Sequence, residues 1–268
     1  MTFRYNTSGK WFKGNTHIHS RMSDGGRTFA ELADMYAAAG YAFLYRTDHW
    51  FSSDVASDAG AYPLLWLDGI ELNGRDHTGA DYHVVCLGRV AGFRPGNKPA
   101  VDLEAGMRAA REQGALIILA HPHWCGNSLD DALRWDFDGV EIYNNVCHWQ
   151  NGKSNGLIHW DTVLMRNTVT LGLAVDDAHL SPGEPGWNGG WIVVNAPVCT
   201  REEIGANIRR GNFYSSCGPQ LHSLKYDGER LLAEMSPVRF ARLVGPGARG
   251  MRQGGDGGNL LETVSFPV

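Results

Sequence analysis

The chain has 268 residues, of which 43% are apolar and 20% are charged, enough for one sizeable folded core. This composition excludes a disordered protein, and the net charge of −5 gives no bulk attraction to a nucleic acid duplex. The five cysteines form no C-x-x-C pair, which is typical of a reduced intracellular protein. The sequence shows no signal peptide and no apolar run that could span a bilayer, so we expect a cytoplasmic protein without a membrane partner.

Short apolar runs alternate with helical patterns along the first 220 residues. After a first strand that ends at 16–19, apolar runs predict strands at 41–46, 64–72, 82–87, 115–120, 139–143, 169–175 and 191–195. Helices are predicted at 100–113, 128–135 and 157–166, and from two capping boxes that begin at Thr28 and Thr200. Repeated alternation of strand and helix predicts parallel strands in a barrel or a doubly wound sheet.

From about residue 221 the pattern changes to short alternating stretches separated by glycine-rich turns. We therefore expect a barrel-type domain at 1–220 and a short β-rich tail at 221–268.

Histidines and acidic residues follow the predicted strands, where a barrel of parallel strands gathers its functional groups. Nine candidates share this placement: His17, His19, Asp24, His49, Glu71, His83, His121, Asp177 and His179. Imidazole and carboxylate together suit zinc, manganese and iron. His17 and His19 lie two apart on a strand, so both side chains point to one side. Because nine ligands are too many for one ion, we expect two or three divalent ions with Glu71 as a bridge.

Single residues of this set also have ordinary explanations. A lone histidine inside a strand, such as His83, is more often a hydrogen-bonded core residue, and an H-x-H pair arises by chance in many proteins. We interpret Asp48 as structural, and His77, His159 and His222 as surface or structural residues. The placement of all nine candidates beside strands is hard to explain as coincidence, so the sequence favours a metal site.

The motifs around these residues resemble the polymerase and histidinol phosphatase (PHP) family over roughly residues 12–220. The matching segments, in chain order, are 17–19, 23–25, 47–49, 69–71, His83, 120–122, 139–141, 177–179 and the closing segment 210–218. The resemblance implies an α/β fold, a distorted (β/α)7 barrel, and the nine candidates as ligands of two or three metal ions. The residues at 176–179 and the β-like tail look closest to the stand-alone branch that includes carbaryl-hydrolase-like enzymes.

The leading functional hypothesis is a phosphoesterase that hydrolyses a small phosphomonoester or phosphodiester with a metal-activated hydroxide. Arg21 lies between two candidate ligands, and Arg46 is a charge in an apolar strand, so both are candidates to bind phosphate. Alternatively, Arg21 is a solvated loop charge and Arg46 belongs to a structural salt bridge.

The alternative is hydrolysis of a carbamate or carboxylic ester with an aryl group. This alternative rests on aromatic side chains in or beside the loops that follow strands, because aromatic rings suit a flat apolar group. These rings could instead only pack the loops against the barrel. They are Trp50, Phe51, Trp124, Tyr143, Trp149, Trp187 and Trp191.

Two histidines near the predicted strand ends are candidate general acids, and one amide is a candidate substrate contact. His123 follows the ligand candidate His121, and His148 lies in the loop after the strand at 139–143. Asn144 could donate a hydrogen bond to substrate. A third hypothesis is a non-catalytic metal-binding module, but the presence of all nine ligand candidates favours an active enzyme.

Overall fold

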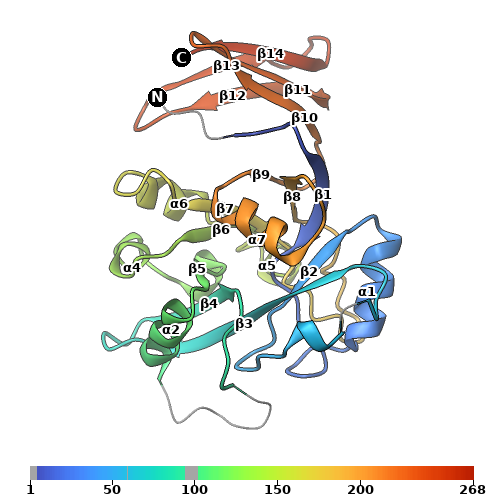
Figure 1. The fold of residues 1–268 in the computed structure, drawn as a ribbon. Helices are drawn as coiled ribbons and strands as arrows, with labels where there is room; N and C mark the ends of the chain where they lie inside the picture. The colour runs from blue at the N-terminus through green and yellow to red at the C-terminus, as the bar shows by residue number, and fades with distance from the viewer. Residues whose placement is uncertain (1–4, 59, 94–101) are drawn as a thin grey trace.

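The computed structural model describes residues 5–58, 60–93 and 102–268. Its main element is a nine-stranded sheet in the order β7-β6-β5-β4-β3-β2-β1-β8-β9. The strands are β1 Lys10–Asn15, β2 Phe43–Arg46, β3 Leu65–Arg75, β4 Asp81–Leu87, β5 Leu116–Leu119, β6 Gly139–Asn144, β7 Leu171–Val175, β8 Trp191–Ala196 and β9 Phe213–Ser216. The Ser215 hydroxyl of β9 donates to O of Gly172 and accepts from N of Ala174, both in β7. The two edges of the sheet therefore meet, and the sheet forms a nearly closed barrel (Figure 1).

Two strands of the barrel run against the others. The sets β1–β2–β3 and β5–β6–β7 are parallel, whereas β4 is antiparallel to both of its neighbours and β8 is antiparallel to β1 and β9. The expected distorted α/β barrel is confirmed, and the reversed strands are part of the distortion. As a consequence, β4 begins at the end of the barrel where the parallel strands finish.

Helices cover the outside of the barrel (Figure 1). They are α1 Phe29–Ala38, α2 Leu103–Glu112, α3 Pro122–Cys125, α4 Leu129–Arg134, α5 Asn145–Asn151, α6 Leu157–Leu164 and α7 Arg201–Arg209, with a 3-10 turn at Val55–Asp58. The side chains of Thr28 and Thr200 cap α1 and α7 as predicted. The predicted start of a helix at 100–101 lies outside the described residues. Within the described part of the chain, no helix has the length and apolar character needed to cross a membrane.

Alternating side chains divide the core into an inner and an outer layer. In β2, Phe43 and Tyr45 point into the barrel, whereas Leu44 packs in the layer beside α1. In β5, Leu116 and Ile118 lie inside, and Ile117 and Leu119 pack against the helices. This period of two is the pattern of strands buried on both faces. Each such side chain stabilises the fold by about 1.5–3 kcal/mol.

The first strand is shifted from its predicted place. We expected a strand that ends at 16–19, but β1 ends at Asn15 and residues 16–19 form an extended segment with one bridge, Ile18 to Ala178. The sequence misplaced the strand because its segment, KWFKGN, contains two lysines, a glycine and an asparagine and lacks a continuous apolar run.

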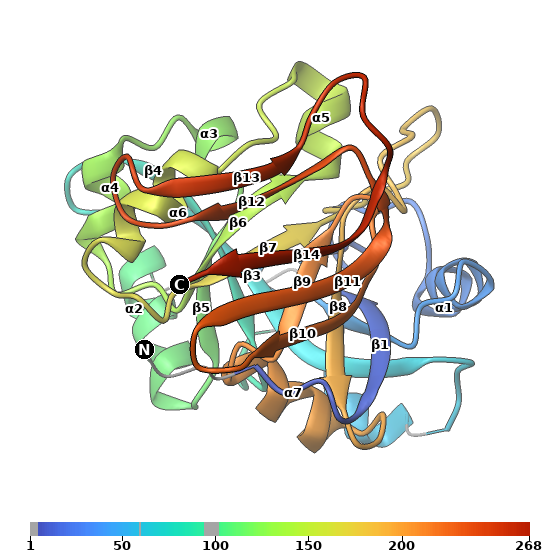
Figure 2. The same ribbon diagram turned by 90° about the horizontal axis from the view of Figure 1, so that it is seen from above.

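The C-terminal residues form the expected additional β-structure. Strands β10 Leu221–Tyr226, β11 Arg230–Val238 and β14 Leu261–Pro267 make an antiparallel sheet, and β12 Phe240–Val244 pairs with β13 Gly250–Gly254. These strands form a layer above the barrel in Figure 1 and lie across it in Figure 2. The division into domains at residue 220 stays a prediction.

Candidate metal centre

Two chain segments far apart in sequence bring the first ligand candidates together at one end of the barrel. N of His19 donates to O of Ala178, and N of Asp177 donates to O of His17. The segment after β1 therefore lies against the segment after β7. On the other side of β1, an isolated bridge joins His49, after β2, to Glu71 in β3.

The deepest group of ligands is fully buried and tightly spaced. Nε2 of His17 and Nε2 of His19 lie 3.1 Å apart, and each lies 3.0–3.2 Å from Oε2 of Glu71 and Oδ1 of Asp177. Ligand atoms around a tetrahedral zinc ion with bonds of about 2.0 Å are separated by about 3.3 Å. The four atoms therefore have the spacing and the chemistry of a metal site.

Three buried polar atoms in and beside this group lack hydrogen-bond partners among the described residues. They are Oε2 of Glu71 and Oδ1 of Asp177 in the group, and Nδ1 of the neighbouring His49. Leaving a buried polar atom unsatisfied costs about 1–3 kcal/mol. A divalent cation held by these atoms would offset that cost, so the residues present fit the metal that the sequence predicts.

A second group lies nearer the surface and shares His19 with the first. Nδ1 of His19 lies 3.4 Å from Oδ1 of Asp24. The other oxygen of Asp24 lies 3.4 Å from Nε2 of His179 and 3.6 Å from Nε2 of His49. These four residues could hold one cation, with ligand atoms within 4.8 Å of one another.

Glu71 connects these ligands to the remaining two histidines. Its Oε1 lies 2.7 Å from Nδ1 of His83 and 3.5 Å from Nε2 of His121. His83 reaches this end of the barrel because β4 runs antiparallel, which the sequence did not predict. Since the two oxygens of Glu71 face different histidines, a bridging role for this carboxylate is geometrically consistent.

The carboxylates create a field that favours positive charge. Burial lowers the pKa of His19, but the neighbouring carboxylates of Asp177 and Glu71 outweigh burial and raise that pKa to about 10. Burial raises the pKa of Glu71, yet the imidazoles of His17, His49 and His83 hold it well below its usual value. Both pKa shifts show that the carboxylates favour a positive charge in this group, which is also what a cation site requires.

The backbone is strained at these ligands. His121 has φ 24° and Asp177 has φ 55°, and the residues that follow His49 and His179 also have positive φ. Left-handed conformations are costly for residues with a side chain, and they occur where a functional geometry is imposed by the surrounding fold.

Sequence reasoning missed Glu141 as a member of this centre, although its segment was part of the resemblance. Its Oε1 lies 2.6 Å from Nδ1 of His17, and its Oε2 accepts hydrogen bonds from N of His121 and Nδ2 of Asn144. Nδ2 of Asn144 also donates to Asp177. Both amide hydrogens of Asn144 are therefore used on carboxylates, so Asn144 orients ligands and has none left for substrate.

A cavity of about 370 Å³ opens over the ligands. Its walls are formed by seven of the ligand candidates together with Trp124, Val146, Gln150, Ser181 and Glu184. The ring of Trp124 packs edge-on against His83 and His121. Of the residues predicted to bind substrate, Trp124 is thus placed at the cavity.

Besides Asn144, four predicted catalytic or substrate-binding residues are not among those that line this cavity. His123 and His148 are exposed on α3 and α5, so their role as general acids stays a prediction. Nε of Arg21 donates to O of Gly26. Arg46 is buried and forms an ion pair with Asp58 at 2.7 Å, which is the structural salt bridge considered as its alternative.

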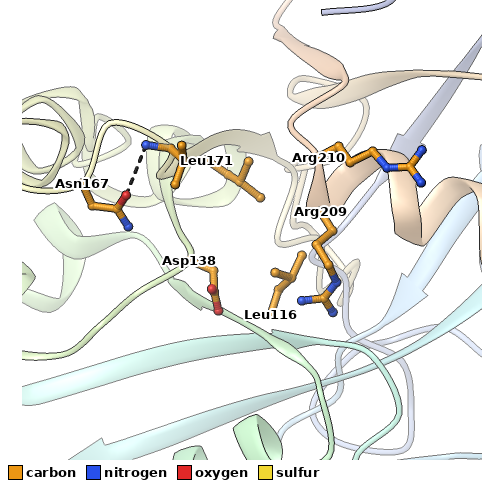
Figure 3. A pocket seen from close by; sticks show the side chains of 7 residues that line it. Leu116, Asp138, Asn167, Leu171, Arg209 and Arg210 are labelled. Atoms are coloured by element: carbon orange, nitrogen blue, oxygen red, sulfur yellow. Dashed lines mark hydrogen bonds between the residues drawn. The ribbon is translucent and has the colours of Figure 1, made fainter. Parts of the chain in front are cut away.

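A larger cavity of about 490 Å³ lies at the opposite end of the strands. Leu116 and Leu171 begin their strands there, and Arg209 and Arg210 lie at the end of α7 (Figure 3). No cluster of metal-ligand type among the described residues includes a residue of this cavity. In barrels this end contributes to stability and the other end carries function, so the smaller cavity is the candidate active site.

Known proteins resemble this chain in sequence and in fold. No protein-family model matches the chain. The chain is 30% identical over 185 residues to a 3',5'-nucleoside bisphosphate phosphatase from Chromobacterium violaceum, which covers 64% of this chain and 56% of that protein. Among solved structures, a two-domain protein from Bacteroides vulgatus that contains a predicted PHP-like metal-dependent phosphoesterase superimposes with a TM-score of 0.61. That match is 12% identical and covers 97% of this chain and 86% of the other.

The chain thus has the fold of a protein that contains a predicted PHP-like metal-dependent phosphoesterase. The structural match extends through the C-terminal strands, so the PHP-like two-domain protein shares the whole fold described above. The chain spans little more than half the length of the curated phosphatase that it matches.

Proposed function

We propose that this chain is a metal-dependent phosphoesterase of the PHP family that hydrolyses a small phosphomonoester or phosphodiester. The observation that carries the proposal is the buried group of His17, His19, Glu71 and Asp177, in which each histidine Nε2 lies 3.0–3.2 Å from the two carboxylates. Two of these residues, Glu71 and Asp177, line the cavity. The phosphatase name of the Chromobacterium relative supports the same reaction class.

We assign two or three divalent cations to the candidate ligands. The buried group would hold one, the group of Asp24, His49 and His179 with His19 a second, and Glu71 with His49 and His83 a third. Divalent ions at such a centre lower the pKa of water and neutralise phosphate oxygens. Imidazole and carboxylate donors serve manganese, iron and zinc alike, so metal analysis of the purified protein must decide among them.

The protein's own side chains position these ligands. Glu141 holds Nδ1 of His17, so that Nε2 faces Glu71 and Asp177. The Asp48 carboxylate accepts hydrogen bonds from N of Ser20 and from both N and Oγ of Ser23, which fixes the loop before Asp24. The ligands are thus held in place before substrate binds.

The second candidate reaction, hydrolysis of an aryl carbamate or carboxylic ester, is favoured by Trp124 alone. Trp50 packs on Phe93 and donates to O of Asn73. Trp187 packs on Tyr36, and the ring of Trp191 forms a cation–π contact with the ammonium of Lys13. These rings have structural partners, so the aromatic lining of the cavity is less extensive than the sequence predicted.

A substrate panel separates the two reactions. The protein should be loaded in turn with manganese, zinc and iron, and tested with aryl phosphates, nucleotides, aryl carbamates and aryl esters. We expect hydrolysis of at least one phosphoester. Turnover of carbamates or esters without any phosphoester would replace the proposal with the second candidate. Less than one tightly bound metal per chain, without turnover, would indicate a non-catalytic module.

A further inference from the structure

The cavity residues other than the candidate metal ligands determine which leaving group the site can accept, in charge and in polarity. Five residues make this wall: Trp124, Val146, Gln150, Ser181 and Glu184. They come from α3, α5 and the loop after β7. A substrate whose phosphate lies at the metal ligands places its leaving group against this wall.

The wall has acidic character. None of the described residues that line the cavity is a lysine or an arginine, whereas Glu184 adds a carboxylate beyond the ligands. Oε2 of Glu184 accepts a hydrogen bond from N of Ser181 at 3.3 Å, and no ion pair of Glu184 is present within the described segments. The two arginines predicted to bind phosphate are engaged elsewhere, Arg46 with Asp58 and Arg21 with O of Gly26.

A second anionic group on the substrate would therefore lie beside the Glu184 carboxylate without a basic partner. Like charges brought together in a partly desolvated site disfavour binding strongly. The relative from Chromobacterium is named for a substrate with two phosphates. The wall of this chain is unsuited to such a substrate, because it presents the Glu184 carboxylate and no arginine or lysine to a second phosphate.

Trp124 adds an exposed aromatic surface to the wall. One side of its ring packs against His83 and His121, and 37% of the residue is exposed. An indole and a carboxylate that line the same cavity suit an apolar or cationic group, since a cation gains from both the ring and the charge.

We infer that the substrate carries a single anionic group, the one bound at the metal ligands, and that its leaving group is neutral or cationic, selected by Glu184 and Trp124. This inference rests on the proposed function, which identifies the anionic group at the metal ligands as a phosphate. It predicts a substrate class different from nucleoside bisphosphates, with Glu184 as the residue that discriminates.

Binding of non-hydrolysable phosphonates tests the inference without relying on turnover. The probes are benzylphosphonate and its 4-carboxymethyl and 4-aminomethyl derivatives, titrated calorimetrically into the metal-loaded full chain. We expect the carboxylate derivative to bind at least about tenfold more weakly than benzylphosphonate, and the ammonium derivative to bind at least as tightly as benzylphosphonate. Glu184→Gln should reduce the penalty on the carboxylate to less than about threefold.

Glu229→Gln is the matched control, because it removes the same charge from the exposed turn between β10 and β11. This variant should keep the wild-type order of affinities. Equal affinities of the three probes for the wild type, no binding of any probe, or an unchanged penalty in Glu184→Gln would each overturn the inference. Failure of the proposed function would show differently, as absence of phosphoester hydrolysis in the substrate panel.

Discussion

Nδ1 of His17 lies 2.6 Å from Oε1 of Glu141, and both side chains are almost completely buried. The carboxylate fixes the orientation of the ring, so that Nε2 of His17 points at Glu71 and Asp177. Because Oε2 of Glu141 accepts two further hydrogen bonds, this residue connects the metal ligands to the backbone of the strand ends.

The first prediction concerns this contact. Glu141→Gln replaces a charged acceptor with an amide, which weakens the hydrogen bond to Nδ1 of His17. The new amide group also places a donor where N of His121 or Nδ2 of Asn144 needs an acceptor. We expect zinc affinity, measured by competition with a chromogenic chelator, to fall by about 10- to 100-fold. Circular dichroism should show an unchanged fold. Zinc affinity within twofold of the wild type would contradict the positioning role.

The second prediction concerns the buried ligands themselves. The double substitution His17→Ala and His19→Ala removes two of four closely spaced ligand atoms. Hydrolysis should become undetectable, and bound metal, measured by mass spectrometry, should fall by at least one ion per chain. Arg21→Ala is the control, because this exposed side chain contacts Gly26 and Glu31, and it should retain wild-type activity. Activity in the double variant would refute the ligand assignment.

Much of this centre could be predicted because the carboxyl ends of parallel strands meet at one end of a barrel. The structure brings together eight of the nine candidates for this reason, including His121 and Asp177, and the exception is His83. Their chemical type then indicates a metal site without knowledge of the fold in detail.

What the sequence could not give is the partner of each polar side chain. Arg46 lies in an apolar strand, but the sequence does not say which face of β2 it occupies. The structure places it on the outer face, over the ring of Phe29. Glu141 was overlooked for a related reason, since a single carboxylate in a strand carries no signal of the histidine it contacts. The sequence also did not reveal the direction of each strand. His83 was predicted to lie at the metal centre, and it does so because β4 runs antiparallel to its neighbours.

The third prediction follows from the buried position of Arg46. Its guanidinium binds Asp58 and Ser53 and lies 3.9 Å from the ring centroid of Phe29. Arg46→Met keeps the volume but removes these interactions, and it should lower the free energy of unfolding by about 2 kcal/mol. The kcat/KM at a temperature where the variant is folded should stay within twofold. A large loss of kcat/KM without a loss of stability would instead support phosphate binding by Arg46.

The fourth prediction concerns acid stability. Burial raises the pKa of Asp76, but hydrogen bonds from Thr78 and Arg134 outweigh this and lower it to about 2. Because the folded-state pKa lies below the unfolded value, the carboxylate stabilises the fold above about pH 4. That stabilisation is lost as the pH falls towards 2.

Urea unfolding of wild type and Asp76→Asn should measure this effect. The variant should be less stable by about 1 kcal/mol at pH 6, with allowance for solvent screening around the partly exposed Arg134. The difference should shrink as the pH falls from 4 towards 2. A difference that is independent of pH over this range would show that the carboxylate charge has no part in stability.

The fifth prediction uses two tryptophans that the sequence treats alike and the structure separates. Trp124 lines the cavity and contacts two metal-ligand histidines, whereas Trp149 is 60% exposed on α5 and is not among the cavity residues. Trp124→Ala should raise KM for an aryl ester of the hydrolysed class by about tenfold, since stacking on an aromatic ring contributes about 1–1.5 kcal/mol. Trp149→Ala should leave KM unchanged. If both variants behave alike, the aryl group does not contact Trp124, and binding must depend on the ligands and the polar wall of the cavity.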